Sequence, residues 1–297
     1  MDKIEKILII KHGALGDLIH VEGLIKSIRK EHKNAKLVLL TSKKFINLME
    51  MCPYIDDLLI DNRESFFNVK KLNNLYKKII KYKFKIIYDL QNSQRTYIYR
   101  KYLFNKIKWI STNRKVHSIS SLRGLEEILK ENLVISKNIY RSDISWLPID
   151  IKGILKSNKI LSKYIVLFPG SSKKNPLKRW PYFKDLAELL ILKEYEVVTI
   201  LGPEELEMSL SFPGHVLKNL NWSQLAGVIK ESIFFVGNDS GPSHIASCLN
   251  KKGLALFGSS TSATRSELKK RKFETLKVHN LNKLDAQKVF KKIIGSI

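Results

Sequence analysis

Short runs of apolar residues alternate with amphipathic segments along the first half of the chain. The first run, residues 6–11, is followed by apolar residues at helical spacing over 17–31. Continuous apolar runs of this length predict buried strands, and apolar positions three or four apart predict amphipathic helices. The pattern predicts strands at 6–11, 36–42, 56–61 and 84–90, and helices at 17–31, 43–50 and 67–82.

A second series follows a weaker connecting stretch at residues 140–163. It predicts strands at 164–170, 196–202, 232–238 and 253–258, and helices at 181–194, 222–230 and 242–250. Short apolar runs between helices are typical of parallel strands covered on both faces. The sequence therefore predicts an α/β protein of two Rossmann-like domains, residues 1–150 and 151–297, facing each other across a cleft. The last helix is a candidate to pack back on the first domain.

The composition indicates ordinary protein cores and no membrane span. Hydrophobic residues make up 44% of the 297 residues, and no segment approaches the roughly 18 apolar residues that a spanning helix needs. Cys52 and Cys248 lie far apart without metal-site spacing, which favours free thiols in a reducing compartment. The N-terminus carries acidic residues and enters a strand at once, so we expect a cytoplasmic protein without a signal peptide.

Positive charge is the unusual feature of the composition. The chain has 53 Lys and Arg against 28 acidic residues, and residues 63–123 alone hold 16 basic and two acidic residues. One explanation is a solvated face in a lysine-rich composition of the kind that AT-rich genomes produce. The other is a surface for an anionic partner, such as a phosphorylated glycan, an anionic lipid surface or a nucleic acid.

The candidate chemistry lies where the predicted strands end. Gly16 and Asp17 follow the first strand and open a helix, and Asp239 and Ser240 follow the strand at 232–238. Helix capping would explain these acids and the serine by itself, because Asp and Ser accept hydrogen bonds from free N–H groups at helix starts. The alternative is a ligand site, since ligands bind at the carboxyl ends of strands in open α/β sheets.

The strand at 164–170 leads into another turn of this kind. Gly170, Ser171 and Ser172 form a flexible loop with hydrogen-bond donors, and Lys178 and Arg179 stand just before the next helix. Such a turn, with cations and a helix N-terminus, favours phosphate binding. A solvated basic loop is the alternative.

Other positions give weaker signals. Glu204 follows the strand at 196–202 and is a candidate to bind ribose hydroxyls, or it merely favours a helix N-terminus. The histidines outside these turns are scattered, and no carboxylate cluster suggests Mg²⁺. We therefore expect neither a metal ion nor a cofactor.

Four stretches of the chain resemble glycosyltransferase family 9, the family of ADP-heptose:lipopolysaccharide heptosyltransferases. They occur in the family's order between residues 7 and 258: ILIIKHGALGDLIHVEGLIKSIRK, DLQNSQR, LFPGSSKKNPLKRWP and FVGNDSGPSHIASCLNKKGLALFG. The resemblance implies a GT-B fold with the active site in the cleft. It also implies an inverting, metal-independent transfer of a sugar, heptose from ADP-heptose, onto a lipopolysaccharide-core or related glycan acceptor.

The resemblance further implies roles for matching positions. The family's GxxGD aspartate is the general base, here Asp17, and the lysine that supports the diphosphate is Lys178. The donor-binding candidates are Gly170, Ser171, Ser172, Lys178, Glu204, Asp239, Ser240, Gly241 and His244, and the acceptor-binding candidates are Gly16, Asp89, Gln91 and Arg95. His12 departs from the family, where many members have a small polar residue.

The basic residues within 63–123 are then expected to form a face that docks on anionic membrane or glycolipid, peripherally, at the inner face of the cytoplasmic membrane. Two other classes stay open. A nucleotide-sugar epimerase of GT-B fold would need no acceptor. A nucleic-acid-binding protein would suit a pI of 9.8 and the tyrosines within residues 63–123. No recognisable nucleic-acid module is present, so we expect no nucleic-acid partner.

Overall fold

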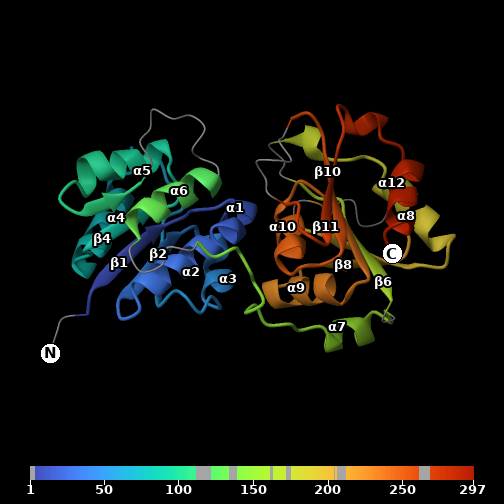
Figure 1. Cartoon of the computed structure of the whole chain (residues 1–297), viewed down its shortest axis with the longest axis horizontal. Coiled ribbons are helices and arrows are strands. Elements are labelled where there is room, and N and C mark those ends of the chain that lie inside the picture. The colour runs from blue at the N-terminus through green and yellow to red at the C-terminus, as the bar shows by residue number, and fades with distance from the viewer. Residues whose placement is uncertain are drawn as a thin grey trace. The chain divides into compact units, whose positions relative to one another are not determined.

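The structure is a computed structural model that describes residues 4–111, 122–133, 139–160, 163–171, 175–203, 205, 212–260 and 268–297. The chain divides into two compact units, Met1–Trp146 and Leu147–Ile297. Each unit is built on one parallel sheet with helices on both of its faces (Figure 1). No helix among the described residues is long and apolar enough to cross a membrane.

The sheet of the first unit has the strand order β3-β2-β1-β4-β5. Its strands are β1 (Lys6–Ile10), β2 (Lys36–Thr41), β3 (Asp57–Ile60), β4 (Ile86–Asp89) and β5 (Lys108–Ile110). Its α-helices include α1 (Leu15–His20), α2 (Glu22–Glu31), α3 (Ile46–Met49), α4 (Val69–Tyr82), α5 (Gln94–Ile98) and α6 (Leu122–Asn132).

The apolar residues of this sheet are buried from both sides. Figure 1 shows α2 and α3 on one side of the sheet and α4 and α5 on the other. On the second side, Leu75 and Ile79 of α4 pack with Tyr99 against Leu8 and Ile87 of the sheet. These helices connect the parallel strands, because the chain must cross back over a face of the sheet before the next parallel strand begins.

The sheet of the second unit has the strand order β11-β10-β9-β6-β7-β8. Its strands are β6 (Tyr164–Phe168), β7 (Glu196–Leu201), β8 (His215–Lys218), β9 (Phe234–Asn238), β10 (Gly253–Phe257) and β11 (Phe273–Lys277). Its helices include α7 (Lys152–Ser157), α8 (Phe183–Ile191), α9 (Trp222–Glu231), α10 (Gly241–Cys248) and α12 (Ala286–Ile294).

One core joins α8 and α12 to a face of this sheet. Phe183 and Leu186 of α8 and Val289 and Ile293 of α12 are buried together with apolar residues of β6, β9 and β10. The last helix thus packs against α8 of its own unit. Figure 1 shows α9 and α10 on the opposite face of the sheet.

The two parallel sheets with helices on both faces confirm the predicted α/β class. Three short strands, β5, β8 and β11, were not expected from the apolar pattern, and α7 lies within the predicted connection. Each of these strands has exposed or half-buried residues and lies at a sheet edge. Edge strands need no continuous apolar run, because part of their surface faces solvent.

Both sheets contain a point where the strand order reverses. In the first unit it lies between β1 and β4, and in the second between β6 and β9. Loops leave neighbouring strands in opposite directions there, and the crevice this creates is where open α/β sheets bind ligands. The turns predicted to carry chemistry begin at these four strands, except for that of Glu204, which follows β7.

Candidate active site

At the reversal in the first unit, the chain leaving β1 is tied to the end of β4. The buried Nζ of Lys11 donates a hydrogen bond to the backbone oxygen of Leu90 at 3.1 Å. The backbone N–H of His12 donates to Oε1 of Gln91 at 2.9 Å. Burial lowers the pKa of Lys11, although two nearby carboxylates act in the opposite direction. Gln91, an expected acceptor-binding residue, therefore anchors the turn that leads to Asp17.

The turn itself presents a carboxylate. Gly13 has a φ of 124°, and a Cβ there would approach the Phe45 ring to 2.4 Å, so the position requires glycine. Asp17 is exposed, and its Oδ2 accepts a hydrogen bond from the backbone N–H of Ala14 at 3.2 Å. Its Oδ1 makes no hydrogen bond to the described residues. Asp17 thus caps α1 and keeps one oxygen open, while Gly16 is buried.

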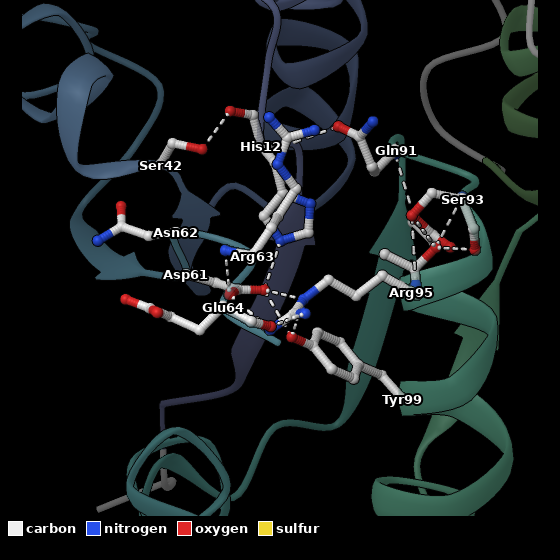
Figure 2. A network of polar contacts seen from close by, with 12 residues as sticks. His12, Ser42, Asp61, Asn62, Arg63, Glu64, Gln91, Ser93, Arg95 and Tyr99 are labelled. Atoms are coloured by element: carbon white, nitrogen blue, oxygen red, sulfur yellow. Dashed lines mark hydrogen bonds and ion pairs between the residues drawn. The ribbon is translucent and has the colours of Figure 1, made fainter. Parts of the chain in front are cut away.

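A second carboxylate, Asp61, lies buried behind this turn and was not predicted (Figure 2). Its Oδ2 is 2.8 Å from Nε2 of His12 and accepts from the Tyr99 hydroxyl at 2.6 Å. Arg95 binds both carboxylate oxygens, from Nε and Nη2, at 3.0 Å each. Burial alone would raise the pKa of Asp61, but the hydrogen bonds from His12, Arg95 and Tyr99 lower it well below its usual range. The charge of Arg95, an expected acceptor ligand, is therefore balanced inside the protein.

Asp89, the third expected acceptor residue, shapes the turn after β4. It is 4% exposed, and its Oδ1 accepts from the backbone N–H groups of Gln91 and Asn92 at 3.0 and 2.8 Å. Burial raises the pKa of Asp89. The aspartate holds the backbone of this motif in place.

A cavity of about 390 Å³ opens beside Asp61 and Arg95. Lys71 pairs with Glu64 across its lining at 2.7 Å, whereas Lys43 and Lys78 form no ion pair with described residues. The excess of cations over carboxylates suits an anionic ligand. The lining residues are Lys43, Ile60, Asp61, Asn62, Glu64, Ser65, Lys71, Leu72, Asn74, Leu75, Lys78 and Arg95.

In the second unit, three of the expected donor-binding side chains come together. Nζ of Lys178 lies 2.7 Å from Oδ2 of Asp239, and Nε2 of His244 lies 3.9 Å from the other carboxylate oxygen. Lys178 comes from a short 3₁₀ helix, Pro176–Lys178, while the other two flank the start of α10. The Lys178 and Asp239 side chains are 19% and 12% exposed, so solvent or a ligand reaches this pair.

The start of α10 has no side-chain cap. Ser240 occupies the N-cap position, yet its hydroxyl accepts no capping hydrogen bond and lies 3.4 Å from the Ser243 hydroxyl. Asp239 does not cap the helix either, since its carboxylate faces Lys178. Gly241 is the first helical residue. A helix N-terminus without a cap, beside a cation, is suited to a phosphate group.

The turn after β6 is held by an ion pair between a half-buried arginine and a buried glutamate. Nη2 of Arg179 is 2.8 Å from Oε1 of Glu205 and donates to the backbone oxygen of Ser171 at 3.0 Å. A Cβ on Gly170 would approach Glu205 to 2.8 Å, so this glycine lets the chain pass close to the carboxylate. The buried Ser171 hydroxyl has no partner among the described residues.

Asn238, at the end of β9, links the strand ends at this reversal. Its Nδ2 donates to the backbone oxygen of Pro169 at 2.8 Å, and its Oδ1 accepts from the backbone N–H of Trp180 at 3.0 Å. The predicted ligands Ser172 and Glu204 lie outside the described residues. Within the described part of the chain, no group of three His, Cys, Asp or Glu residues is placed to hold a metal ion.

Comparison with known proteins connects these turns to one family. Residues 138–294 match the sequence model of glycosyltransferase family 9 (heptosyltransferase). Lipopolysaccharide heptosyltransferase 1 of Campylobacter coli is 25% identical over 298 residues, which cover 86% of this chain and 85% of that protein.

Solved structures show the same fold at low sequence identity. Escherichia coli ADP-heptose lipopolysaccharide heptosyltransferase II gives a TM-score of 0.74 at 17% identity, with 98% of each chain covered. An E. coli heptosyltransferase solved with ADP-2-deoxy-2-fluoro heptose gives 0.75 at 15% identity, covering 98% of this chain and all of the other. This likeness confirms the expected GT-B fold. Since the family match extends over more than half of the sequence, the chain belongs to glycosyltransferase family 9 and is a glycosyltransferase.

Proposed function

We propose that this enzyme transfers heptose from ADP-heptose to a lipopolysaccharide-core or related glycan acceptor, with inversion and without a metal ion. The observation that carries the proposal is the division of chemistry between the two strand-order reversals. The first presents an exposed carboxylate on a fixed turn, and the second presents a cation beside an uncapped helix start. A general base and an anion site are the two requirements of such a transfer.

In the proposed reaction, Asp17 accepts the proton of an acceptor hydroxyl. That oxygen attacks the anomeric carbon from the side opposite the diphosphate and forms the new glycosidic bond. The bond between the anomeric carbon and the diphosphate oxygen breaks, and its electron pair leaves with ADP. The face of attack requires inversion of configuration at that carbon.

The second unit would bind the donor. Lys178 and the backbone N–H groups at the start of α10 would stabilise the negative charge on the departing diphosphate. To do so, the Lys178 ammonium group must donate to the diphosphate in place of Asp239. The Asp239 carboxylate can then accept hydrogen bonds from sugar hydroxyls. The relative solved with an ADP-heptose analogue supports ADP-heptose as the donor. We assign Gly170 and Ser171 to the same donor site.

The test begins with thermal-shift measurements on the full chain with ADP, UDP, GDP and their sugar-linked forms. We expect ADP and ADP-heptose to give the largest stabilisation, because a ligand that binds only the folded state raises its stability. Transfer is then assayed with lipopolysaccharide-core acceptors in EDTA, and the anomeric configuration of the product is read by NMR. Retention of the anomeric configuration or a requirement for added metal would contradict the proposal. Chemical conversion of the nucleotide-sugar in the absence of an acceptor would contradict it as well, and would indicate an epimerase.

We further propose that the basic face of the first unit docks on an anionic membrane or glycolipid. Helix α4 contains no acidic residue, and at its N-terminal end Phe67, just before the helix, and Val69, its first residue, are 95% and 70% exposed. Each Lys near an anionic surface contributes about 1 kcal/mol to binding, and the effect declines within a Debye length of about 10 Å. The exposed lysines of the helix are Lys70, Lys71, Lys77, Lys78 and Lys81.

Sedimentation with anionic and neutral vesicles at low and high salt tests this docking. Changing Lys77, Lys78, Lys81, Lys83 and Lys85 to Gln should release the enzyme from anionic vesicles. The matched control changes five exposed lysines of the second unit to Gln and alters net charge equally: Lys272, Lys277, Lys283, Lys288 and Lys291. Equal loss in both variants, or binding that ignores lipid charge, would reduce the basic face to a solvated surface.

A further inference from the structure

The segment between β1 and the Asp17 turn is held by one residue, His12, that contacts the ends of three other strands. Its backbone N–H binds Gln91 after β4, and its backbone oxygen accepts from the Ser42 hydroxyl after β2 at 2.8 Å. Its ring reaches Asp61 after β3 at 2.8 Å. The side chain is fully buried, so every polar contact it makes is with the protein.

The surroundings of Asp61 fix the role of the ring. Arg95 and Tyr99 already donate to this carboxylate, and its pKa is lowered, so it is ionised and only accepts hydrogen bonds. Nε2 of His12 must therefore carry a hydrogen and donate a hydrogen bond to Asp61. The other ring nitrogen, Nδ1, is buried and has no partner among the described residues. The imidazole serves here as a single directed N–H donor.

From His12 the chain passes through two constrained residues to the carboxylate of Asp17. Gly13 has the positive φ that packs it against Phe45, and the N–H of Ala14 donates to Oδ2 of Asp17. Displacement of His12 would move both residues and, with them, the direction in which Asp17 points. Asp61 also lines the cavity described above. The hydrogen bond between His12 and Asp61 therefore connects the lining of the cavity with the turn that carries Asp17.

We propose that His12 is a positioning residue, which through its N–H bond to Asp61 holds the turn that orients Asp17. The assignment rests on the proposed function, in which Asp17 is the base. A histidine that served only as core filler would need volume at this position but no donor directed at Asp61.

Two variants with amide side chains test whether the N–H group directed at Asp61 is needed. In His12→Gln the side-chain nitrogen lies as many bonds from Cα as Nε2 does and can reach Asp61. In His12→Asn it lies one bond closer and cannot. We expect His12→Asn to accelerate backbone amide exchange in peptides covering residues 13–20 by about tenfold, since one net hydrogen bond is worth about that factor. His12→Gln should restore slow exchange.

Kinetics give the second readout. A displacement of about 1 Å in a catalytic group costs up to about 100-fold in rate, so kcat should fall 10- to 100-fold in His12→Asn. The KM for the donor should stay unchanged, and His12→Gln should recover most of the loss. Amide exchange needs neither donor nor acceptor. A wild-type enzyme that transfers no sugar would therefore contradict the proposed function while the exchange data still decide the role of His12 in holding the turn.

Tyr99→Phe is the matched control, because it removes a different donor from the same carboxylate. It should leave exchange in residues 13–20 unchanged. Equal acceleration in Tyr99→Phe and His12→Asn, equal behaviour of His12→Gln and His12→Asn, or no change in His12→Asn would each overturn the proposal. If His12→Asn does not fold, His12→Phe keeps the volume of the ring and removes the donor to Asp61, and a turn that stays protected in this variant would overturn the proposal as well.

Discussion

The two units each place a carboxylate beside a cation near the strand-order reversal, but the surroundings of the two carboxylates differ. Asp61 of the first unit is 4% exposed and accepts hydrogen bonds from two nitrogens of Arg95, from the Tyr99 hydroxyl and from the His12 ring. Asp239 of the second unit has a side chain that is 12% exposed, with Lys178 as its close partner.

This difference separates a fixed framework from an exchangeable pair. A buried carboxylate whose oxygens already accept several hydrogen bonds does not need a ligand to compensate for its burial. Removing one partner leaves buried polar groups without a hydrogen bond, which is destabilising. The Lys178–Asp239 pair has fewer partners and reaches solvent, so a phosphate can replace Asp239 as the partner of the lysine, and a sugar hydroxyl can replace Lys178 as the partner of the aspartate. The first cluster thus supports a turn, and the second is suited to direct binding.

The largest effect is expected at the carboxylate that the framework supports. We expect Asp17→Asn to lower kcat by about 10²- to 10⁴-fold, the usual contribution of a general base, with the affinity for the donor nearly unchanged. Initial rates and donor calorimetry measure the two quantities. Glu50→Gln, an exposed acid elsewhere in the first unit, is the charge-matched control. Full activity in Asp17→Asn would reduce this residue to the cap of α1.

Alanine substitution of the two carboxylates tests the comparison directly. Asp61→Ala should reduce the free energy of unfolding by about 3–5 kcal/mol, because it removes the buried acceptor that Arg95, Tyr99 and His12 share and leaves Arg95 without its counter-ion. Asp239→Ala should cost less than this, because Asp239 has one close cationic partner, Lys178, which reaches solvent. Urea unfolding of both variants measures the difference. Equal losses would mean that the second cluster is also part of a rigid framework.

A third carboxylate, Glu22 of α2, is buried against N–H groups. It accepts hydrogen bonds from the backbone of Asp143 and from Nε1 of Trp146, and burial is the main cause that raises its pKa from 4.5 to about 7. Because the folded-state pKa is raised, the stabilisation is complete below about pH 4.5 and is lost as the pH rises to about 7.

Glu22→Gln should remove this dependence, since the amide does not titrate. Between pH 4.5 and 7 the wild type should lose up to about 3 kcal/mol of stability relative to the variant, from about 1.4 kcal/mol per pKa unit. Urea unfolding of both proteins across this range gives the difference. Parallel curves would show that the pKa of Glu22 is the same in the folded and unfolded states.

The exchangeable pair should divide its effects between two ligands. Lys178→Ala should weaken ADP and ADP-heptose alike by roughly 10- to 30-fold, the loss of one charge-assisted hydrogen bond of about 1.5–2 kcal/mol. Asp239→Ala should weaken ADP-heptose and leave ADP nearly unaffected. Calorimetry with the two ligands separates them. Equal losses for both ligands in both variants would contradict the assignment of phosphate to Lys178 and sugar to Asp239.

The sequence predicts best what depends on neighbours along the chain. The buried strands β1, β6 and β9 were predicted because each is a continuous apolar run. Asp17 and Asp239 were selected because each lies in the turn after such a run and matches a motif of the family that the sequence resembles. The partners that decide how these side chains are used lie far away in sequence. His12 and Asp61 are 49 positions apart, and Arg179 and Glu205 are 26 apart.

For that reason the sequence could select Arg95 as a ligand but could not show that Asp61 already balances its charge. The only local signal for His12 was its difference from the small polar residues that many family members have. Likewise, the sequence allowed Ser240 to cap α10, and only side-chain geometry could decide between a cap and a ligand contact.

The smallest expected effect concerns the N-cap position of α10, which Ser240 occupies. The residue at the N-cap of the preceding helix, Asn221, is the matched control. Asn221 caps α9, accepting from the Gln224 backbone N–H at 2.9 Å, whereas Ser240 accepts no such bond at α10. Asn221→Ala should therefore cost about 1 kcal/mol of stability, and Ser240→Ala less than about 0.5 kcal/mol. In ADP binding the order should reverse, with a loss of about two- to tenfold for Ser240→Ala, the value of one neutral hydrogen bond, and none for Asn221→Ala. A thermal unfolding series with and without ADP measures both quantities. If Ser240→Ala destabilises the free protein as much as Asn221→Ala does and leaves ADP binding intact, the serine at the end of β9 is a structural cap, and the phosphate must be bound by other groups of the second unit.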